Sequence, residues 1–355
     1  MTEEVPSVAQ DFGFRGPLAR TVPLIRAMSL VPAIRWLHEQ GRSPESYLRN
    51  AGLPVSPLEN PLRPIPLLHV ARLVKALECL GGPDVCCKIV SSASLLELAL
   101  LGRVALGSRT PAEALERISA SLPLFCSHEN LSVNRNGGTL VVMHSYSVRF
   151  NPAAEHLLFQ YAAAMTDRLC AATGEATPSL ADVKLPPHPE HGIAHLDRWF
   201  GPSVSSLPGH ALEITVNQEV ADRRFPVLGR DRTQQMEPMD ITPLRGDGTL
   251  SDSVSITLTS MLDDGLPTIA DLALASGMSS RSLQRRLLEE GSTFSRLLDS
   301  ARRNAAMKRL AEGTEKVASV AADLGYSRQA SLTRAMRRWT GKPPIRFRGS
   351  GGSKR

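Results

Sequence analysis

Three polar side chains near the C-terminal end of the chain fall at helical spacing: Arg281, Gln284 and Arg285. Residues at positions i, i+3 and i+4 share one face of an α-helix. Arg can donate two parallel hydrogen bonds to O6 and N7 of guanine, and Gln can pair in the same way with N6 and N7 of adenine. The spacing therefore predicts a helix face that contacts base edges in the major groove of DNA.

A second group of polar residues recurs further along the chain. It comprises Arg328, Gln329, Ser331, Thr333 and Arg334. Arg334 falls at the position equivalent to Arg285, 49 residues later. Hydroxyl groups such as those of Ser and Thr can bond to a base or to a phosphate. We therefore expect both groups of side chains to contact DNA, through two separate helices.

The residues before each polar group predict how these two helices are held. Ala273-x3-Gly277 and Ala321-x3-Gly325 repeat one skeleton 48 residues apart. A small Ala lets a second helix cross close to the first, and a Gly permits the tight turn between them. The pattern is typical of two helix-turn-helix units, each of which places its second helix in a major groove.

Caps and apolar positions agree with this interpretation. Thr268 and Asp271 form a capping-box pattern at the start of the first unit. Two apolar residues four positions apart predict the inward side of each second helix: Leu283 with Leu287, and Leu332 with Met336.

A helix is also predicted between the two units, over residues 294–313. About 17 helical residues at ~1.5 Å each rise by roughly 25 Å. Successive major grooves on one face of B-DNA are ~34 Å apart. We therefore expect the domain either to bend the DNA or to insert one of its two helices less deeply. Arg302 and Arg303, which lie on this helix, are expected to make ion pairs within the domain or contacts with phosphates.

The charge of the chain is unevenly distributed. Residues 251–355 hold 18 Lys and Arg against 10 Asp and Glu, whereas the whole chain of 355 residues holds 41 against 35. A cationic end on a nearly neutral remainder favours contact with a polyanion through that end alone. The length predicts two domains, and the polar, Pro- and Gly-containing residues 230–251 are the predicted linker. Residues 1–20 and 349–355 are expected to be a disordered arm and tail.

Residues 21–229 predict a mixed α+β domain in which helices dominate. Helical periodicity covers residues 23–41, 66–82, 110–125 and 151–174. Two β-type runs flank the turn at Asn136, Gly137 and Gly138, and shorter strands are expected at 181–185 and 211–216. The remainder, residues 252–348, is predicted to be all-α.

Longer motifs surround the predicted DNA contacts. They are GMSSRSLQRRL in the first unit, the frame of Phe294, Arg302 and Ala306 in the helix between the units, and a C-terminal pattern of Trp339, Gly341 and Pro344. With these motifs, residues 252–348 resemble the DNA-binding domain of AraC-family transcription regulators. The resemblance implies two helix-turn-helix motifs joined by a long helix, with base contacts from the eight polar residues named above. Leu332 and Met336 stand where Phe is usual in the family, and Pro343 where Ser is usual, which alters packing volume and the C-terminal turn.

The N-terminal domain is similar, in the order of its elements and in segments such as FGPSVSSLPGHALEITVN, to the non-cupin effector domains of this family. The resemblance implies a domain that senses a small effector or dimerises. The alternative is regulation by protein–protein contact without a small ligand. Residues that could line an effector pocket, or be plain core, are Trp36, His38, His144, Tyr146, Phe159 and Tyr161.

From these observations we expect promoter DNA, a small-molecule effector, RNA polymerase and a second copy of the chain as partners. Whether the protein is an activator or a repressor depends on where its operator lies. We expect no cofactor and no enzymatic activity, because the chain has no G-x-S-x-G, P-loop or G-x-G-x-x-G in a suitable context. It also has neither a signal peptide nor an apolar run long enough to span a bilayer, which predicts a cytoplasmic location.

Two further candidates for chemistry are weak in the sequence. His191 and His195 would share a helix face as zinc ligands do, with His188 nearby, but three prolines surround them and no H-E-x-x-H is present. We therefore expect no metal site. The five cysteines form no C-x-x-C pair, and we expect buried, reduced thiols.

Overall fold

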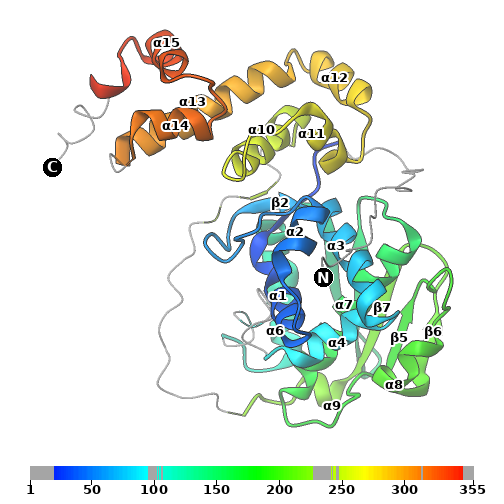
Figure 1. The fold of residues 1–355 in the computed structure, drawn as a ribbon. Helices are drawn as coiled ribbons and strands as arrows, with labels where there is room; N and C mark the ends of the chain where they lie inside the picture. Colours follow the sequence, from blue (N-terminus) through cyan, green and yellow to red (C-terminus); the bar gives the residue numbers. More distant parts are fainter. Residues whose placement is uncertain are drawn as a thin grey trace. The chain divides into compact units, whose positions relative to one another are not determined.

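The computed structural model describes residues 20–94, 102, 104, 107–226, 241, 243–244, 248–312 and 315–346. The chain divides into two compact units, one from Pro23 to Leu244 and one formed by Arg20–Val22 with the chain from Arg245 onward. Helices and strands mix in the first unit, and the second is helical (Figure 1). The tail at 349–355, residues 1–19 and most of the predicted linker lie outside the described residues.

A five-stranded sheet forms one layer of the N-terminal unit, in the order β3-β4-β7-β5-β6. Its pairs are antiparallel except β5 with β6. The predicted hairpin is confirmed, with Gly137 and Gly138 in the turn at φ values of 53° and 91°. The two shorter predicted strands are also confirmed. The strands are β3 (Glu129–Asn136), β4 (Thr139–Tyr146), β5 (Asp182–Leu185), β6 (Val204–Ser206) and β7 (Ala211–Asn217).

Helices cover this sheet because each has an apolar face that must be removed from water. The longest is α7 (Pro152–Ala171), whose Asn151 cap accepts a hydrogen bond from the backbone N of Ala153. One buried cluster joins α7 to the sheet and α6, and a second joins α7 to the helices nearest the N-terminus. The other larger helices of the described residues are α1 (Val31–Glu39), α2 (Pro44–Ala51), α3 (Leu67–Gly81), α4 (Val85–Ser92) and α6 (Pro111–Phe125). Two short helices are α8 (Asp197–Phe200) and α9 (Gln218–Ala221).

The prediction of one helix over residues 23–41 is wrong at its start. β1 (Leu24–Arg26) pairs with β2 (Pro64–Pro66), a 3-10 turn follows, and α1 begins only at Val31. Pro32 lies in the first turn of α1 and does not kink a longer helix, since a first-turn residue needs no N–H partner. A distant strand therefore decides the conformation of these residues, and local periodicity does not.

The C-terminal unit contains six described helices. They are α10 (Leu250–Met261), α11 (Ile269–Ser276), α12 (Ser280–Glu289), α13 (Phe294–Glu312), α14 (Val317–Asp323) and α15 (Gln329–Thr340). The long helix α13 packs against α10 at one part of its length and against α14 and α15 at another. It matches the helix predicted over 294–313 as far as Glu312.

Two remaining expectations can be compared with the structure. None of the helices within the described residues is both long enough and apolar enough to cross a membrane. The five cysteines are free thiols, and four of them are buried. Cys79 is exposed near the end of α3, so the expectation of burial is wrong for this residue.

Candidate nucleic-acid interface and N-terminal cavity

The first helix pair, α11 with α12, is fixed by its caps. Thr268 and Asp271 form a complete capping box, in which each side chain accepts a hydrogen bond from the other residue's backbone N. Gly277 ends α11 in the left-handed conformation, at a φ of 65°. Ser279 then caps α12 by accepting a hydrogen bond from the backbone N of Ser282. The predicted turn between the two helices is therefore confirmed in its local geometry.

Helix α12 has one buried face and one polar face. Leu283 and Leu287 are completely buried, as predicted. Arg281, Gln284 and Arg285 are exposed on the remaining surface of α12. The Nε of Arg285 lies 3.6 Å from Oε1 of Glu289 in a solvent-exposed pair. Such a pair adds little stability, so it would not prevent the guanidinium from contacting another partner.

The second helix pair, α14 with α15, turns at Gly325. Its φ of +75° is unfavourable for any residue with a side chain. A Cβ atom here would also lie 2.9 Å from Cδ2 of Leu266 and 3.1 Å from Nη2 of Arg302. Arg302 lies over the ring of Tyr326, at 5.2 Å from its centroid. Arg302, which was expected to make ion pairs or phosphate contacts, therefore packs against this turn.

Helix α15 presents a less uniform polar surface than α12. Leu332 and Met336 are completely buried, as predicted. Arg328, which is the N-cap residue, Gln329 and Arg334 are exposed. Ser331 and Thr333 are half-buried and already bonded within the helix. The hydroxyl of Thr333 donates to the carbonyl of Gln329 at 3.1 Å, and Nη2 of Arg334 donates to Oγ of Ser331 at 3.3 Å.

An acidic residue that the sequence analysis missed anchors α15 to α13. The carboxylate of Asp299 accepts hydrogen bonds from Nη2 of Arg338, at 3.0 and 2.9 Å, and from Nε1 of Trp339, at 3.2 Å. Arg309 pairs with Glu315 and Asp323 and so ties α13 to α14, and these carboxylates raise the pKa of Arg309. The Arg and Trp pattern near the C-terminus was the only signal of the anchor at Asp299, because the acidic partner of Arg338 is 39 residues away.

The N-terminal unit encloses a cavity of about 190 Å³ between the sheet and its helices. Strands supply alternate residues to it and helices supply residues three or four positions apart, as the two periodicities require. From β3 and β4 come Glu129, Leu131, Val142, His144 and Tyr146. From α7 come Leu158, Tyr161, Ala162, Met165 and Thr166, while α3 and α6 contribute aliphatic and aromatic side chains.

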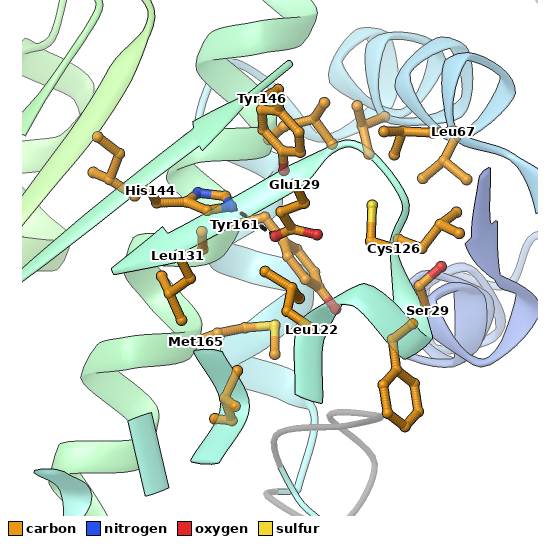
Figure 2. Close-up of a pocket in the computed structure, with 18 of the residues that line it drawn as sticks. Ser29, Leu67, Leu122, Cys126, Glu129, Leu131, His144, Tyr146, Tyr161 and Met165 are labelled. Carbon is orange, nitrogen blue, oxygen red and sulfur yellow. Dashed lines mark hydrogen bonds and ion pairs between the residues drawn. The ribbon is translucent and has the colours of Figure 1, made fainter. Parts of the chain in front are cut away.

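Few polar groups interrupt the apolar wall of this cavity (Figure 2). Oε1 of Glu129 lies 2.6 Å from Nε2 of His144. The other ring nitrogen, Nδ1 of His144, and Oγ of Ser29 are buried and find no hydrogen-bond partner within the described chain. Burial raises the pKa values of Tyr146 and Tyr161, so both phenols stay neutral.

Three of the six predicted lining residues meet at this cavity: His144, Tyr146 and Tyr161. Phe159 is buried beside His144, at 5.6 Å between ring centroids, but does not line the space. Trp36 is buried in the neighbouring core cluster and His38 is exposed. Glu129 was missed, although a charged residue at an inward position of a predicted strand was a usable signal.

The histidines considered as metal ligands form a cluster elsewhere in the N-terminal unit. Glu78, His188 and His191 place one potential ligand atom each within 4.8 Å of one another. Nδ1 of His188 accepts hydrogen bonds from the backbone N of Glu190 and of His191, both at 3.2 Å. The proton of a neutral ring then lies on Nε2, which is 3.0 Å from Oε1 of Glu78. In that tautomer Nε2 carries the proton and offers no lone pair to a metal ion, although it makes no hydrogen bond within the described residues.

The helix face that His191 and His195 were considered to share is not present in the structure. His188 and Gly192 instead form a β-bridge, and His195 lies in a 3-10 turn (Ala194–Leu196). Nε2 of His195 lies 3.1 Å from Nε2 of the completely buried His156. Nδ1 of His156 donates to the carbonyl of Pro186 at 2.8 Å. Burial lowers the pKa of His156 to about 4 and also lowers the pKa values of His188 and His195.

A mixed α/β domain, a helical domain with two similar helix pairs, and a cationic C-terminal end together define a class of DNA-binding regulator. Two family models match the chain. One, described as a helix-turn-helix domain, matches residues 272–350. The other, described as the arabinose-binding domain at the N-terminus of AraC transcription regulators, matches residues 41–224, more than half of the chain. The chain therefore belongs to the AraC family of transcription regulators.

Two proteins with similar sequences are also transcriptional regulators. The HTH-type transcriptional regulator VqsM of Pseudomonas aeruginosa is 35% identical over 150 residues, which are 41% of this chain and 44% of that protein. The HTH-type transcriptional regulator VirS of Mycobacterium tuberculosis is 34% identical over 131 residues, 37% of this chain and 38% of that protein. The matches thus span less than half the length of these relatives. The crystal structure of the transcriptional regulator CdpR from Pseudomonas aeruginosa covers 87% of this chain and 98% of its own, at 18% identity and a TM-score of 0.36.

Proposed function

We propose that this regulator binds its operator through two helix-turn-helix units, with α12 and α15 in adjacent major grooves. The observation that carries the proposal is the division of both helices into a buried apolar face and an exposed polar one. The DNA-contact candidates remain the residues predicted from the sequence: Arg281, Gln284, Arg285, Arg328, Gln329, Ser331, Thr333 and Arg334.

The two units are proposed to contribute unequally. α12 presents three long side chains on a capped frame, and hydrogen bonds to base edges need such reach. On α15 two of the candidates, Ser331 and Thr333, have short side chains and are half-buried. We therefore assign most of the sequence discrimination to the first helix pair, and more of the affinity and register to the second.

The length of α13 bears on the shape of the bound DNA. Its 19 residues rise by roughly 28 Å, still less than the ~34 Å between successive major grooves. We propose that the operator bends, or that one helix is inserted less deeply. A circular-permutation gel that shows no bend, together with footprints over both half-sites, would contradict bending.

For the N-terminal unit we propose that a small effector occupies the cavity. The support is an apolar space with a few convergent polar groups, two of which lack a partner within the described residues. A homodimer and a contact with RNA polymerase belong to the same proposal, as they would link effector binding to transcription. Regulation by protein contact alone is the competing proposal, and it does not need this cavity.

The experiment that tests the proposed function is selection of genomic DNA fragments by the purified full-length protein, with and without a metabolite extract. We expect a defined operator in both arms and a change in affinity when the extract is present. Failure to enrich any sequence would refute sequence-specific binding. An operator with no response to any extract would favour regulation by protein contact.

A further inference from the structure

The polar end of the cavity indicates the chemical class of its ligand, and this inference rests on the proposed effector binding. We propose that the cavity binds a small apolar molecule that carries a protonated amino group, with the ammonium at Glu129 between the rings of Tyr146 and Tyr161. Figure 2 shows the Glu129 carboxylate directed into the cavity, with His144 to one side.

His144 contacts Glu129 through one of its two ring nitrogens. Nε2 of His144 lies 2.6 Å from the Glu129 carboxylate, whereas Nδ1 is buried and lacks a partner within the described residues. A hydrogen bond from Nε2 uses one lone pair of the carboxylate, which can accept further hydrogen bonds from a ligand.

Arg26 also lines the cavity and donates hydrogen bonds to backbone carbonyls. Its Nε donates to the carbonyl of Leu124, in α6, at 3.1 Å, and its Nη1 donates to the carbonyl of Leu62 at 2.7 Å. A carboxylate that faces apolar side chains attracts a cation more strongly than one in bulk water.

Two aromatic rings complete a site that suits an ammonium group. Tyr146 and Tyr161 line the same cavity as Glu129. Tyr146 is also directly opposite Glu129 in the register of β3 and β4. Ring faces attract a desolvated cation, and a neighbouring carboxylate adds a charge-assisted hydrogen bond. The same carboxylate repels an anionic ligand, so a fatty acid or other carboxylate is excluded.

The aliphatic side chains of the cavity wall determine the character of the uncharged end of the ligand. Leu67, Val70, Leu115, Ile118 and Leu131 are among its lining residues, and their side chains can bury only an apolar body. The ligand is thus expected to have one charged end and one hydrocarbon end.

The test uses three six-carbon probes that differ only in the head group: hexylamine, 1-hexanol and hexanoate. Binding to the full-length protein is measured by calorimetry at pH 7 in a buffer without amines. We expect hexylamine to bind at least about tenfold more tightly than 1-hexanol, and hexanoate to bind most weakly. Equal affinity for the three probes, or no binding of hexylamine, would overturn the proposal.

Two variants assign the effect to the site. Glu129→Gln keeps the acceptor for His144 but removes the charge, and should lower hexylamine affinity about tenfold with little change for 1-hexanol. Glu219→Gln, an exposed carboxylate on α9, is the control and should bind as the parent does. Retention of the parent's hexylamine affinity by Glu129→Gln would refute the assignment.

A second pair of variants covers the case in which Glu129→Gln does not fold. Tyr161→Phe keeps the ring and should retain hexylamine binding, whereas Tyr161→Leu removes the ring and should weaken it. Equal affinities in the two variants would exclude the aromatic contribution. Operator binding is also measured for every variant. A protein that binds its operator but does not prefer hexylamine would refute the proposed ligand class, whereas a protein that binds no operator would refute the proposed function.

Discussion

Glu129 and His144 lie on adjacent strands, and their side chains approach to 2.6 Å between Oε1 and Nε2 at the wall of an apolar cavity. In the antiparallel register Leu131 lies opposite His144. Glu129, two residues before Leu131, lies opposite Tyr146. Period-two alternation then turns all four side chains to the same face of the sheet. The polar end of the cavity is thus a direct consequence of strand register.

The first prediction concerns base contact by Arg285. We expect Arg285→Ala to cost about 1–3 kcal/mol in operator binding and to relax sequence preference at one base pair, because a bidentate contact to guanine is lost. Affinities for a set of operators with single base-pair changes measure this. Arg168→Ala, an exposed substitution on α7, is the control and should leave the set unchanged. Uniform weakening at every operator would reassign Arg285 to a phosphate.

The second prediction contrasts the other helix pair. We expect Arg334→Ala to weaken binding at all operators and to lower the salt slope of log K by about 1, as the loss of one phosphate contact would. Titrations at several salt concentrations on the same operators provide the measurement. A change confined to one base pair would show that α15 contributes discrimination as α12 does.

The third prediction separates backbone strain from packing in the C-terminal unit. Gly325 and Gly341 both have positive φ, at 75° and 72°. An added Cβ would contact neighbouring side chains at Gly325, but would meet no atom within 4 Å at Gly341. Gly341→Ala should therefore cost about 1–2 kcal/mol from the left-handed backbone alone. Gly325→Ala should cost more, because Leu266 and Arg302 must move as well. Denaturant unfolding of the two variants gives the difference, and equal losses would mean that these neighbours adapt freely.

The fourth prediction is a loss of stability of the N-terminal unit in acid. Burial lowers the pKa of His156 from 6.5 to about 4, so the folded state favours the neutral ring. The resulting stability is complete above pH 6.5 and is lost as the pH falls toward 4, by up to about 3 kcal/mol. Glu155 acts in the opposite sense, because burial raises its pKa to about 7 and its contribution is lost as the pH rises.

The contribution of His156 is isolated by comparing variants. As the pH is lowered from 7 to 4, the melting temperature of the parent should fall more steeply than that of His156→Gln. His191→Gln, at an exposed histidine of the same cluster, should follow the parent. Parallel curves for the parent and His156→Gln would show that His156 does not titrate in this range.

Local sequence determined the C-terminal unit almost completely. Thr268, Gly277 and Gly325 carry caps and turns that act within a few residues, and Leu283 and Leu332 mark inward faces by helical spacing alone. Both kinds of signal depend on short-range backbone geometry, so they can be recognised without knowledge of the rest of the chain. The anchor at Asp299 could not, because its partners lie on another helix.

In the N-terminal unit the sequence indicated four of the helical segments and the position of the hairpin turn, but not α2 or α4, and the tertiary structure decided what these elements enclose. Leu24 forms a strand only because residues 64–66 pair with it, against the helical pattern around it. His144 and Tyr161 were recognisable as candidates, but Phe159 has the same character and lies in solid core. Whether a side chain faces a cavity or another side chain depends on how sheet and helices meet, and that is fixed by contacts between residues far apart in the chain.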